Sequence, residues 1–337
     1  MDIKNNAKEK PRNDEVIDYS IRPAKNIERK MICEALSRLS IISPLREYQY
    51  VGFGSTYFVD FSLFHKYLGI QKLFSIEGDD AAETRVRFNS PYSCIDILIG
   101  KSTDKLPEIP WEKRRSILWL DYTSSLSGYM FSDMATFFNR AVSGSVFLIS
   151  INVEVKDEAG ATTTDARIKS KLNRDSDVKN RIRRNTFELN LKKNDYYSLM
   201  RNVILQEIET ILESRNRIEQ MSKFKFNQIF NFLYHDGQAM LTIGGIVYND
   251  SDEQKINSMN FKNLEFVKEL EESFEIKVPH LTNREIQVID KFLPDFHSDP
   301  DIKAQAFSAL KGIVSESAIE KYADVYRYFP IYKEIAL

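Results

Sequence analysis

The sequence predicts an α/β fold, namely an open, doubly wound, mostly parallel Rossmann-like sheet. Five apolar segments of five to seven residues alternate with stretches of helical periodicity. The interiors of these segments are almost continuously apolar, which is typical of strands buried on both faces of a parallel sheet. Right-handed crossovers between such strands place helices on both faces. With 337 residues, of which 42% are hydrophobic, the chain can build one enlarged domain or two.

The expected strands are short apolar runs, each of which ends at a glycine or a polar residue. They cover residues 48–54, 73–77, 94–99, 116–121 and 145–151. An antiparallel pair is expected over 239–249, because Gly244 and Gly245 separate two further β-type runs and indicate a hairpin turn between them.

The expected helices show apolar residues at spacings of three and four. They cover residues 26–39, 56–68, a segment from 79 or 80 to 89, 132–142 and 198–220. The chain is accordingly divided into three parts. These are an N-terminal helical segment (1–44), a Rossmann-like domain (45–250) with a charged insertion at about 155–197, and a C-terminal helical region (251–337).

Composition excludes several classes of protein. The net charge of −2 gives the whole chain no general attraction to nucleic acid or anionic membrane. No apolar run approaches the about 18–20 residues of a membrane span, and the N-terminus lacks the apolar core of a secretory signal. Cys33 and Cys94 are isolated, so neither a disulfide framework nor a cysteine-rich zinc site is expected. These features predict a cytoplasmic protein without a membrane partner.

Candidate ligand-binding residues are sought beyond the carboxyl ends of the strands, where doubly wound sheets bind ligands. Gly52 and Gly54 follow the first strand and allow a sharp backbone turn beside a helix N-terminus. Glu77 ends the second strand, where a carboxylate can hold a ribose diol. Tyr57 leaves little room for a pyrophosphate and favours a smaller nucleoside ligand over a dinucleotide. The alternatives are an ordinary strand-to-helix turn and, for Glu77, a carboxylate that complements a helix dipole.

Three segments carry a resemblance to a known family. Residues 50–55 (YVGFGS), 75–77 (SIE) and 117–122 (ILWLDY) resemble, in order and spacing, the class I S-adenosylmethionine-dependent methyltransferase superfamily, including bacterial proteins of the O-methyltransferase type. The resemblance extends over about 45–152 and 225–250, and the expected glycine hairpin is similar to the sixth and seventh strands of that fold. It implies S-adenosylmethionine as the cofactor.

The resemblance also implies a role for each strand end. The turn that contains Gly52, Gly54 and Ser55 would lie near the methionine part of the cofactor. Glu77 would hold the ribose hydroxyls, and Ser102 or its neighbours would lie near the adenine.

Asp121 and Tyr122 follow the fourth strand, near the place that the resemblance implies for the transferable methyl group and the acceptor. Either could act as a base or as a positioning group. The alternatives are a helix cap for Asp121 and core packing for Tyr122. The motif Asp-Pro-Pro-Tyr or its variants is absent here, which argues against methylation of exocyclic amines of adenine or cytosine. Asn152 and Asp157 do not complete a cluster of acids, so no metal site is expected.

Two groups of cations are candidates for phosphate binding. Arg22 and Lys25 precede the first helix and are expected to reach the cofactor carboxylate or a substrate phosphate, with a solvated helix start as the alternative. Residues 160–203 carry eleven Lys and Arg against five Asp and Glu, a net charge of +6. Its candidate phosphate ligands are Arg181, Arg183 and Arg184. A solvated loop or a partner-binding helix is the alternative for this segment.

The sequence therefore predicts an S-adenosylmethionine-dependent methyltransferase, with nucleic acid favoured as the acceptor because of the basic insertion. The alternative is a catalytically inactive, methyltransferase-like binding module in a protein assembly such as bacterial anti-phage defence. A nucleotide-dependent oxidoreductase is disfavoured by Tyr57. The expected partners are a nucleic acid or another protein, and the oligomeric state is left open.

Overall fold

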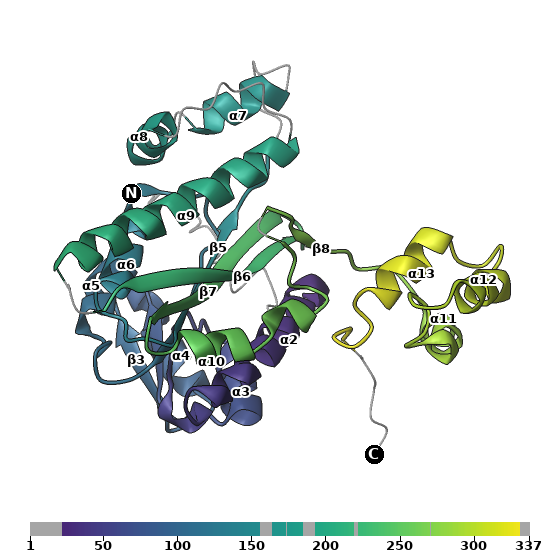
Figure 1. Cartoon of the computed structure of the whole chain (residues 1–337), viewed down its shortest axis with the longest axis horizontal. Coiled ribbons are helices and arrows are strands. Elements are labelled where there is room, and N and C mark those ends of the chain that lie inside the picture. The colour runs from purple at the N-terminus through teal and green to yellow at the C-terminus, as the bar shows by residue number, and fades with distance from the viewer. Residues whose placement is uncertain are drawn as a thin grey trace, which may run out of the picture.

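The structure, a computed structural model, describes residues 22–155, 164–172, 174–184, 193–218, 222–269 and 271–330. Its centre is an eight-stranded sheet with the order β3-β2-β1-β4-β5-β7-β6-β8 (Figure 1). The strands are β1 (Gln49–Gly52), β2 (Leu73–Glu77), β3 (Ile95–Ile99), β4 (Ser116–Asp121), β5 (Ser145–Asn152), β6 (Phe224–His235), β7 (Ala239–Asn249) and β8 (Phe274–Ile276). Strands β1 to β5 are parallel, β7 is antiparallel to β5 and β6, and β8 is parallel to β6. The predicted doubly wound, mostly parallel fold is confirmed.

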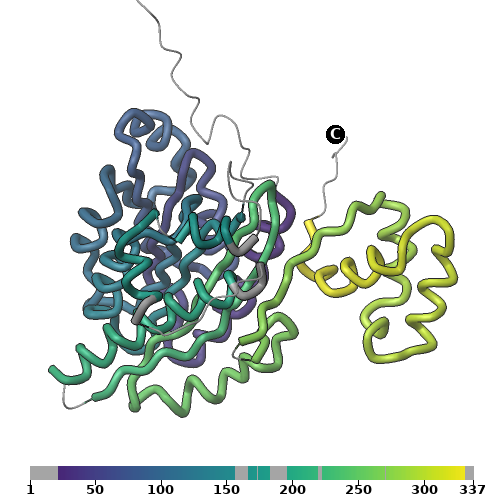
Figure 2. The backbone as a smooth tube through the Cα atoms, turned by 90° about the horizontal axis from the view of Figure 1, so that it is seen from above, coloured from purple at the N-terminus to yellow at the C-terminus, as the bar shows by residue number. Residues whose placement is uncertain are grey.

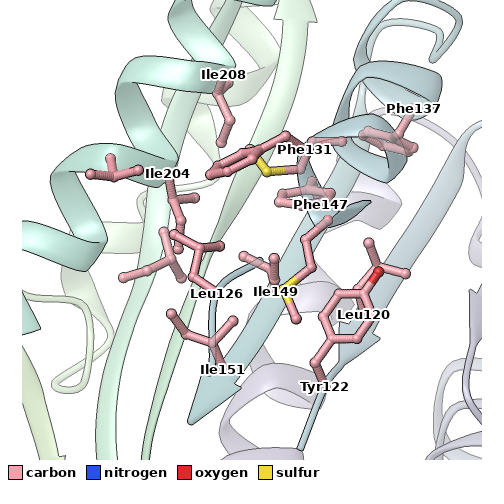
Figure 3. Packing of buried hydrophobic residues seen from close by; sticks show 14 of the residues in the cluster. Leu120, Tyr122, Leu126, Phe131, Phe137, Phe147, Ile149, Ile151, Ile204 and Ile208 are labelled. Atoms are coloured by element: carbon pink, nitrogen blue, oxygen red, sulfur yellow. The ribbon is translucent and has the colours of Figure 1, made fainter. Parts of the chain in front are cut away.

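Helices cover both faces of the sheet and enclose two hydrophobic cores. One face carries α5 (Ser102–Lys105), α6 (Gly128–Phe138) and α9 (Lys193–Ile218), and the other carries α2 (Pro23–Ser37), α3 (Val59–Leu68), α4 (Glu83–Asn89) and α10 (Glu253–Ser258). In Figure 3, Phe131 of α6 and Ile204 and Ile208 of α9 gather over Phe147 and Ile149 of β5. No helix in the described part of the chain is both long enough and apolar enough to cross a bilayer.

The predicted hairpin exists, but its turn lies elsewhere. β6 and β7 are joined by a turn that contains Gly237, whose φ is +80°, whereas Gly244 and Gly245 lie inside β7. A Cβ atom on Gly244 would come within 2.7 Å of the Phe147 carbonyl oxygen in β5, and one on Gly245 would collide with the backbone of Asn227 in β6. The prediction of a turn at these two glycines is therefore wrong, because they allow neighbouring strands to approach closely.

Two helices depart from the sequence prediction because residues far away in the chain cap them. Helix α6 begins at Gly128 rather than 132, and the Gly128 amide donates to Asp175 Oδ2 of the insertion at 2.9 Å. Helix α2 has no side-chain cap from its own N-terminal segment. Instead, Asp236 in the β6–β7 turn accepts hydrogen bonds from the amides of Lys25 at 2.9 Å and Ala24 at 3.4 Å. These caps satisfy amides that a helix end leaves unpaired.

The insertion contributes two described helices, α7 (Thr164–Leu172) and α8 (Ser176–Arg184), which lie beside α9 (Figure 1). Buried apolar residues of both helices join the core that α6 and α9 share. Helix α9 already begins at Lys193, within the segment that the sequence analysis assigned to the insertion.

The region after residue 250 has two parts rather than one. Its first part packs on the main core through Ile256 and adds β8 to the sheet, an element that the sequence did not predict. Its second part contains α11 (Asn283–Ile289), α12 (Pro300–Ala309) and α13 (Glu316–Ala323), which enclose a small core of their own and stand apart from the sheet (Figure 2). Tyr328 and Arg327 tie this part to Glu34 of α2.

Candidate active site

The ends of β1, β2 and β4 lie side by side. Gly52 of β1 pairs with Ser75 of β2 on one side and with Trp119 of β4 on the other. Glu77 and Asp121 lie two residues beyond these partners, so the glycine turn and both carboxylates meet at one edge of the sheet. The strand order reverses between β1 and β4, and such a switch point is where doubly wound sheets bind ligands.

The turn after β1 is packed tightly against the sheet. The Gly54 amide donates to Ser75 Oγ at 3.1 Å, and a Cβ atom at this position would lie 2.8 Å from the ring of Phe58. Ser55 and Phe58 adopt φ values of +52° and +49°, which are unfavourable for side chains of their size. The structure therefore holds strained backbone at this strand end, as ligand-binding turns often do.

Glu77 lies at the end of β2 and is half-buried. Its Oε1 atom accepts a hydrogen bond from the Asp79 amide at 3.2 Å, and its carbonyl oxygen accepts one from the Gly100 amide at 2.9 Å. The first contact orients the carboxylate, and the second holds the backbone at the end of β2. A carboxylate there has the acceptor chemistry that two ribose hydroxyls require.

Ser102 and Tyr122 meet on a buried carboxylate that the sequence analysis did not identify. Ser102 Oγ donates to Asp133 Oδ2 at 2.6 Å, and the Tyr122 hydroxyl donates to the same oxygen. Asp133 lies on α6 and is fully buried, and its Oδ1 atom has no hydrogen-bond partner. Burial raises the pKa of Asp133, and burial together with Asp133 raises the pKa of Tyr122. Tyr122 therefore remains a neutral phenol at physiological pH.

Asp121 is held by Lys25. The Lys25 ammonium lies 2.7 Å from Asp121 Oδ1, 2.7 Å from Glu28 Oε2 and 3.1 Å from the Tyr234 hydroxyl. It also lies 4.3 Å from the centre of the Trp119 ring, a cation–π contact. The Lys25 side chain is 1% exposed, whereas that of Asp121 is 23% exposed. Lys25 thus neutralises the Asp121 carboxylate from its buried side. Of this ion pair, only Asp121 reaches solvent.

The charges of this cluster decide what Asp121 can do. Burial alone would raise the pKa of Asp121, but Lys25 lowers it below its usual value. Burial opposes the charge of Lys25, yet Asp121 and Glu28 raise the pKa of Lys25. For Glu28 burial prevails, and its pKa is raised. A carboxylate with a lowered pKa is a poor general base, so the geometry favours the positioning role of Asp121 over the role of a base.

The N-terminal cations are placed differently from the prediction. Lys25 is enclosed by protein groups, so the expected contact with a cofactor carboxylate or substrate phosphate disagrees with its position. Arg22 Nη2 donates to the Asp236 carbonyl oxygen at 3.3 Å, and its Nε lies 3.8 Å from Asp236 Oδ2. The phosphate-binding role of Arg22 stays a prediction.

One candidate phosphate ligand of the insertion, Arg181, instead connects helices of the fold. Arg181 makes a two-pronged ion pair with Glu207 of α9, at 2.7 and 2.8 Å, and stacks 3.9 Å above the Phe131 ring of α6. This geometry ties α8 to two core helices. The side chains of Arg183 and Arg184 lie outside the described part of the structure, so their role stays a prediction.

Several residues of this site were missed because their local sequence gives no signal. Glu28 and Tyr234 appear in the sequence as ordinary helix and strand positions. Asp133 appears as a polar residue in a mostly apolar helix. Asp236 precedes Gly237, a dipeptide that indicates a turn, and could have been found as a turn residue. Only the sheet order brings these residues to the strand ends.

Comparison with known proteins gives the family. A family described as "Putative O-methyltransferase" matches residues 17–337. The chain belongs to this family. Membership confirms the resemblance to the methyltransferase family that the sequence analysis found. No curated protein matches the sequence significantly.

Solved structures give weaker similarities. A protein described as "the putative methyltransferase" in a complex with the Haloferax volcanii Trm112 methyltransferase activator is 14% identical, with 38% of this chain and 56% of that chain covered and a TM-score of 0.27. The chain therefore spans little more than half the length of that relative. Cofactor-bound Rv0187 from MTB is 11% identical over 71% and 83% of the two chains, with a TM-score of 0.37. A methyltransferase from Listeria monocytogenes is 10% identical over 65% and 98%, with a TM-score of 0.36.

Proposed function

We propose that this chain is an S-adenosylmethionine-dependent O-methyltransferase that binds its cofactor across the ends of β1, β2 and β4. The observation that carries the proposal is the adjacency of the strained Gly54 turn, the Glu77 carboxylate and the ion-paired Asp121 at the switch point of the sheet. These residues fit the cofactor: Glu77 would hold the ribose diol, and the turn would pass close to the methionine part. Ser102 begins α5, three residues beyond the end of β3, and the adenine would lie nearby. When bound, the cofactor supplies an electrophilic sulfonium methyl group.

In this proposal Asp121 orients the acceptor. Because Lys25 keeps it ionised, its exposed oxygen can accept a hydrogen bond from an acceptor hydroxyl. The Lys25 ammonium lies 2.7 Å from Asp121 Oδ1 and offsets its charge. Among the described residues, no cluster of three or more His, Cys, Asp or Glu could hold a metal ion. We therefore propose that Lys25 supplies the positive charge beside Asp121 at this edge.

Cofactor binding tests the assignment directly. S-adenosylmethionine and its demethylated product should each stabilise the protein in a thermal-shift assay, by about 2.7 kcal/mol at 100-fold excess over the dissociation constant. Glu77→Ala should weaken both shifts. The matched control is Glu112→Ala, which removes an exposed carboxylate paired with Arg140. No shift with either compound in the wild type, together with a shift by NAD, would instead indicate an oxidoreductase.

The inactive binding module remains a second candidate because Asp121 is already engaged by Lys25 and no described side chain at this edge is placed as a base. The two candidates differ in turnover. An enzyme transfers label from methyl-labelled S-adenosylmethionine to an acceptor in a cell extract, and Asp121→Asn removes that transfer while cofactor binding persists. An inactive module binds the cofactor and transfers nothing. A role in anti-phage defence belongs to this second candidate.

The acceptor and the location are also proposals. The basic segment 160–203, which covers most of the insertion, supports a nucleic-acid acceptor through its net charge of +6. Salt-sensitive binding of an oligonucleotide that falls on charge reversal at Arg183 and Arg184 would support this acceptor. We propose a cytoplasmic location from the composition and the isolated cysteines.

A further inference from the structure

A buried carboxylate lies behind the proposed transfer edge, and positioning of the acceptor by Asp121 does not use it. Glu28 follows Lys25 by three residues on α2 and is fully buried. Its Oε2 atom lies 2.7 Å from the Lys25 ammonium, but neither of its oxygens accepts a well-aligned hydrogen bond within the described part of the chain. Buried carboxylates normally have such bonds. Glu28 therefore keeps an open position at which a proton can be held.

Lys25 connects this carboxylate to Asp121. Its ammonium carries three protons and lies 2.7 Å from Asp121 Oδ1 as well as from Glu28 Oε2. One ammonium thus faces two carboxylates, and of the two only Asp121 reaches solvent. Both distances are those of charge-assisted hydrogen bonds. A proton on one carboxylate can therefore be exchanged for a proton on the other through Lys25.

Charged and polar side chains face Glu28 from four elements. They are Lys25 and Arg29 of α2, Asp121 of β4, Tyr234 of β6 and Thr242 of β7. All of them except Asp121 are buried. Within the residues that the structure describes, the connection from Glu28 to solvent therefore runs through Lys25 to Asp121.

The two carboxylates differ in their affinity for a proton. Burial raises the pKa of Glu28. Burial acts in the same direction on Asp121, but Lys25 lowers the pKa of that group below its usual value. A proton that arrives on Asp121 is therefore more stable on Glu28. Burial is the usual means by which an enzyme raises the pKa of a glutamate toward the working pH, where a base is most effective.

We infer that Glu28 takes up the proton that the acceptor hydroxyl loses, and that this proton reaches it from Asp121 through Lys25. The inference rests on the proposed function for the existence of the acceptor. Because Glu28 acts through Lys25 and Asp121 and does not touch the acceptor, it is a positioning residue for the proton.

The transfer balances in atoms and charge. The acceptor oxygen forms a bond to the methyl carbon, and the carbon–sulfur bond breaks with its electron pair left on sulfur. The acceptor proton passes to Asp121. One N–H proton of Lys25 passes to Glu28 Oε2, and the proton on Asp121 replaces it on Lys25. Lys25 and Asp121 thereby regain their charges, and Glu28 becomes neutral. After the product leaves, the same exchange in reverse returns the proton to Asp121 and to water.

The first experiment follows the charge of Glu28 without turnover. In protein labelled with ¹³C at the glutamate carboxyls, the NMR signal of Glu28 is assigned by its loss in Glu28→Gln. The signal should be that of a carboxylate at pH 7. On acidification it should take up a proton at a higher pH than the average of the other glutamate signals. If Glu28→Gln does not fold, Glu28→Asp assigns the signal.

The second experiment measures transfer from methyl-labelled S-adenosylmethionine to the acceptor in a cell extract as a function of pH. Wild-type transfer should decline on acidification together with the protonation of Glu28. Glu28→Gln should lower transfer about 100-fold or more and remove this decline, since a general base contributes about that factor. Its affinity for S-adenosylmethionine should stay within about twofold of wild type. Glu28→Asp restores a carboxylate and should recover part of the transfer.

The matched control is Glu34→Gln, the same substitution on the same helix, at an ion pair with Arg327. It should leave transfer within about twofold and the pH profile unchanged. A Glu28 signal that stays protonated at pH 7, a wild-type pH profile in Glu28→Gln, or an equal loss in Glu34→Gln would overturn the inference alone. Absence of transfer by a wild type that binds S-adenosylmethionine would instead overturn the proposed function, and the proton path with it.

Discussion

Replacement of Lys25 by methionine should destabilise the protein by about 3 kcal/mol at pH 7. The substitution keeps the apolar stem and removes an ammonium that is 1% exposed and lies 2.7 Å from both Asp121 and Glu28. Removal of one partner of a buried ion pair costs about 3–5 kcal/mol. The lower end applies here for two reasons. Asp121 keeps partial contact with water and attraction to Arg29, and Glu28, whose pKa burial already raises, can take up a proton.

The pH dependence of this loss follows from the direction of each pKa shift. The lowered pKa of Asp121 stabilises the wild type above the unfolded value of about 3.9, and this contribution is lost as pH falls through the folded value. The raised pKa of Lys25 stabilises at every pH below its unfolded value of about 10.4. The difference in the free energy of unfolding between Lys25→Met and wild type should therefore be largest between about pH 5 and 9. It should decrease below about pH 4.

Chemical denaturation at pH 7 and pH 3.5 measures both effects, and thermal unfolding at pH 7 should show a fall in Tm of roughly 4 °C. The matched control is Lys72→Met, which breaks an ion pair with Asp96 whose side chains are 41% and 49% exposed, and should cost less than about 1 kcal/mol. A loss below 1 kcal/mol for Lys25→Met, or an equal loss at both pH values, would refute the assignment of Lys25 and Asp121 as a buried charge pair.

Three further predictions test other contacts of the fold. Asp236→Ala should destabilise by about 1–2 kcal/mol, because it removes the cap of α2, and loss of helicity is checked by circular dichroism together with denaturation. Arg181→Gln and Glu207→Gln should each destabilise, and the double variant should lose less than the sum, as a double-mutant cycle measures. Gly54→Ala should cost about 1–3 kcal/mol, because the added methyl group would press on Ser75 and Phe58; calorimetry measures the change.

Each of these three has an outcome that contradicts it. An Asp236→Ala protein as stable as wild type would mean that the α2 amides find water instead. Strict additivity of Arg181→Gln and Glu207→Gln would show that the ion pair contributes nothing in solution. A Gly54→Ala protein of unchanged stability would mean that the turn relaxes freely, and the strain described for it would be absent.

The sequence by itself determined the five parallel strands, β1 to β5, and the residues at their ends. Short apolar runs at 73–77 and 116–121 became β2 and β4, because a strand buried on both faces leaves a local signal in every residue. Gly54 and Glu77 were found for the same reason: they follow such runs directly. The family resemblance rested on these segments and was confirmed.

Only the tertiary structure decided which residues of the site contact one another. Lys25 and Asp121 are 96 residues apart, and Asp236 caps a helix that begins more than 200 residues earlier. The position of a hairpin turn, the start of α6 and the addition of β8 were likewise set by neighbours in space. Hydrophobic periodicity is a property of adjacent residues, whereas the partner of a buried charge or an open helix end is chosen by the packed fold, which brings distant carboxylates and amides into contact. For this chain, the outline of the site lies in the sequence, and its electrostatics arise on folding.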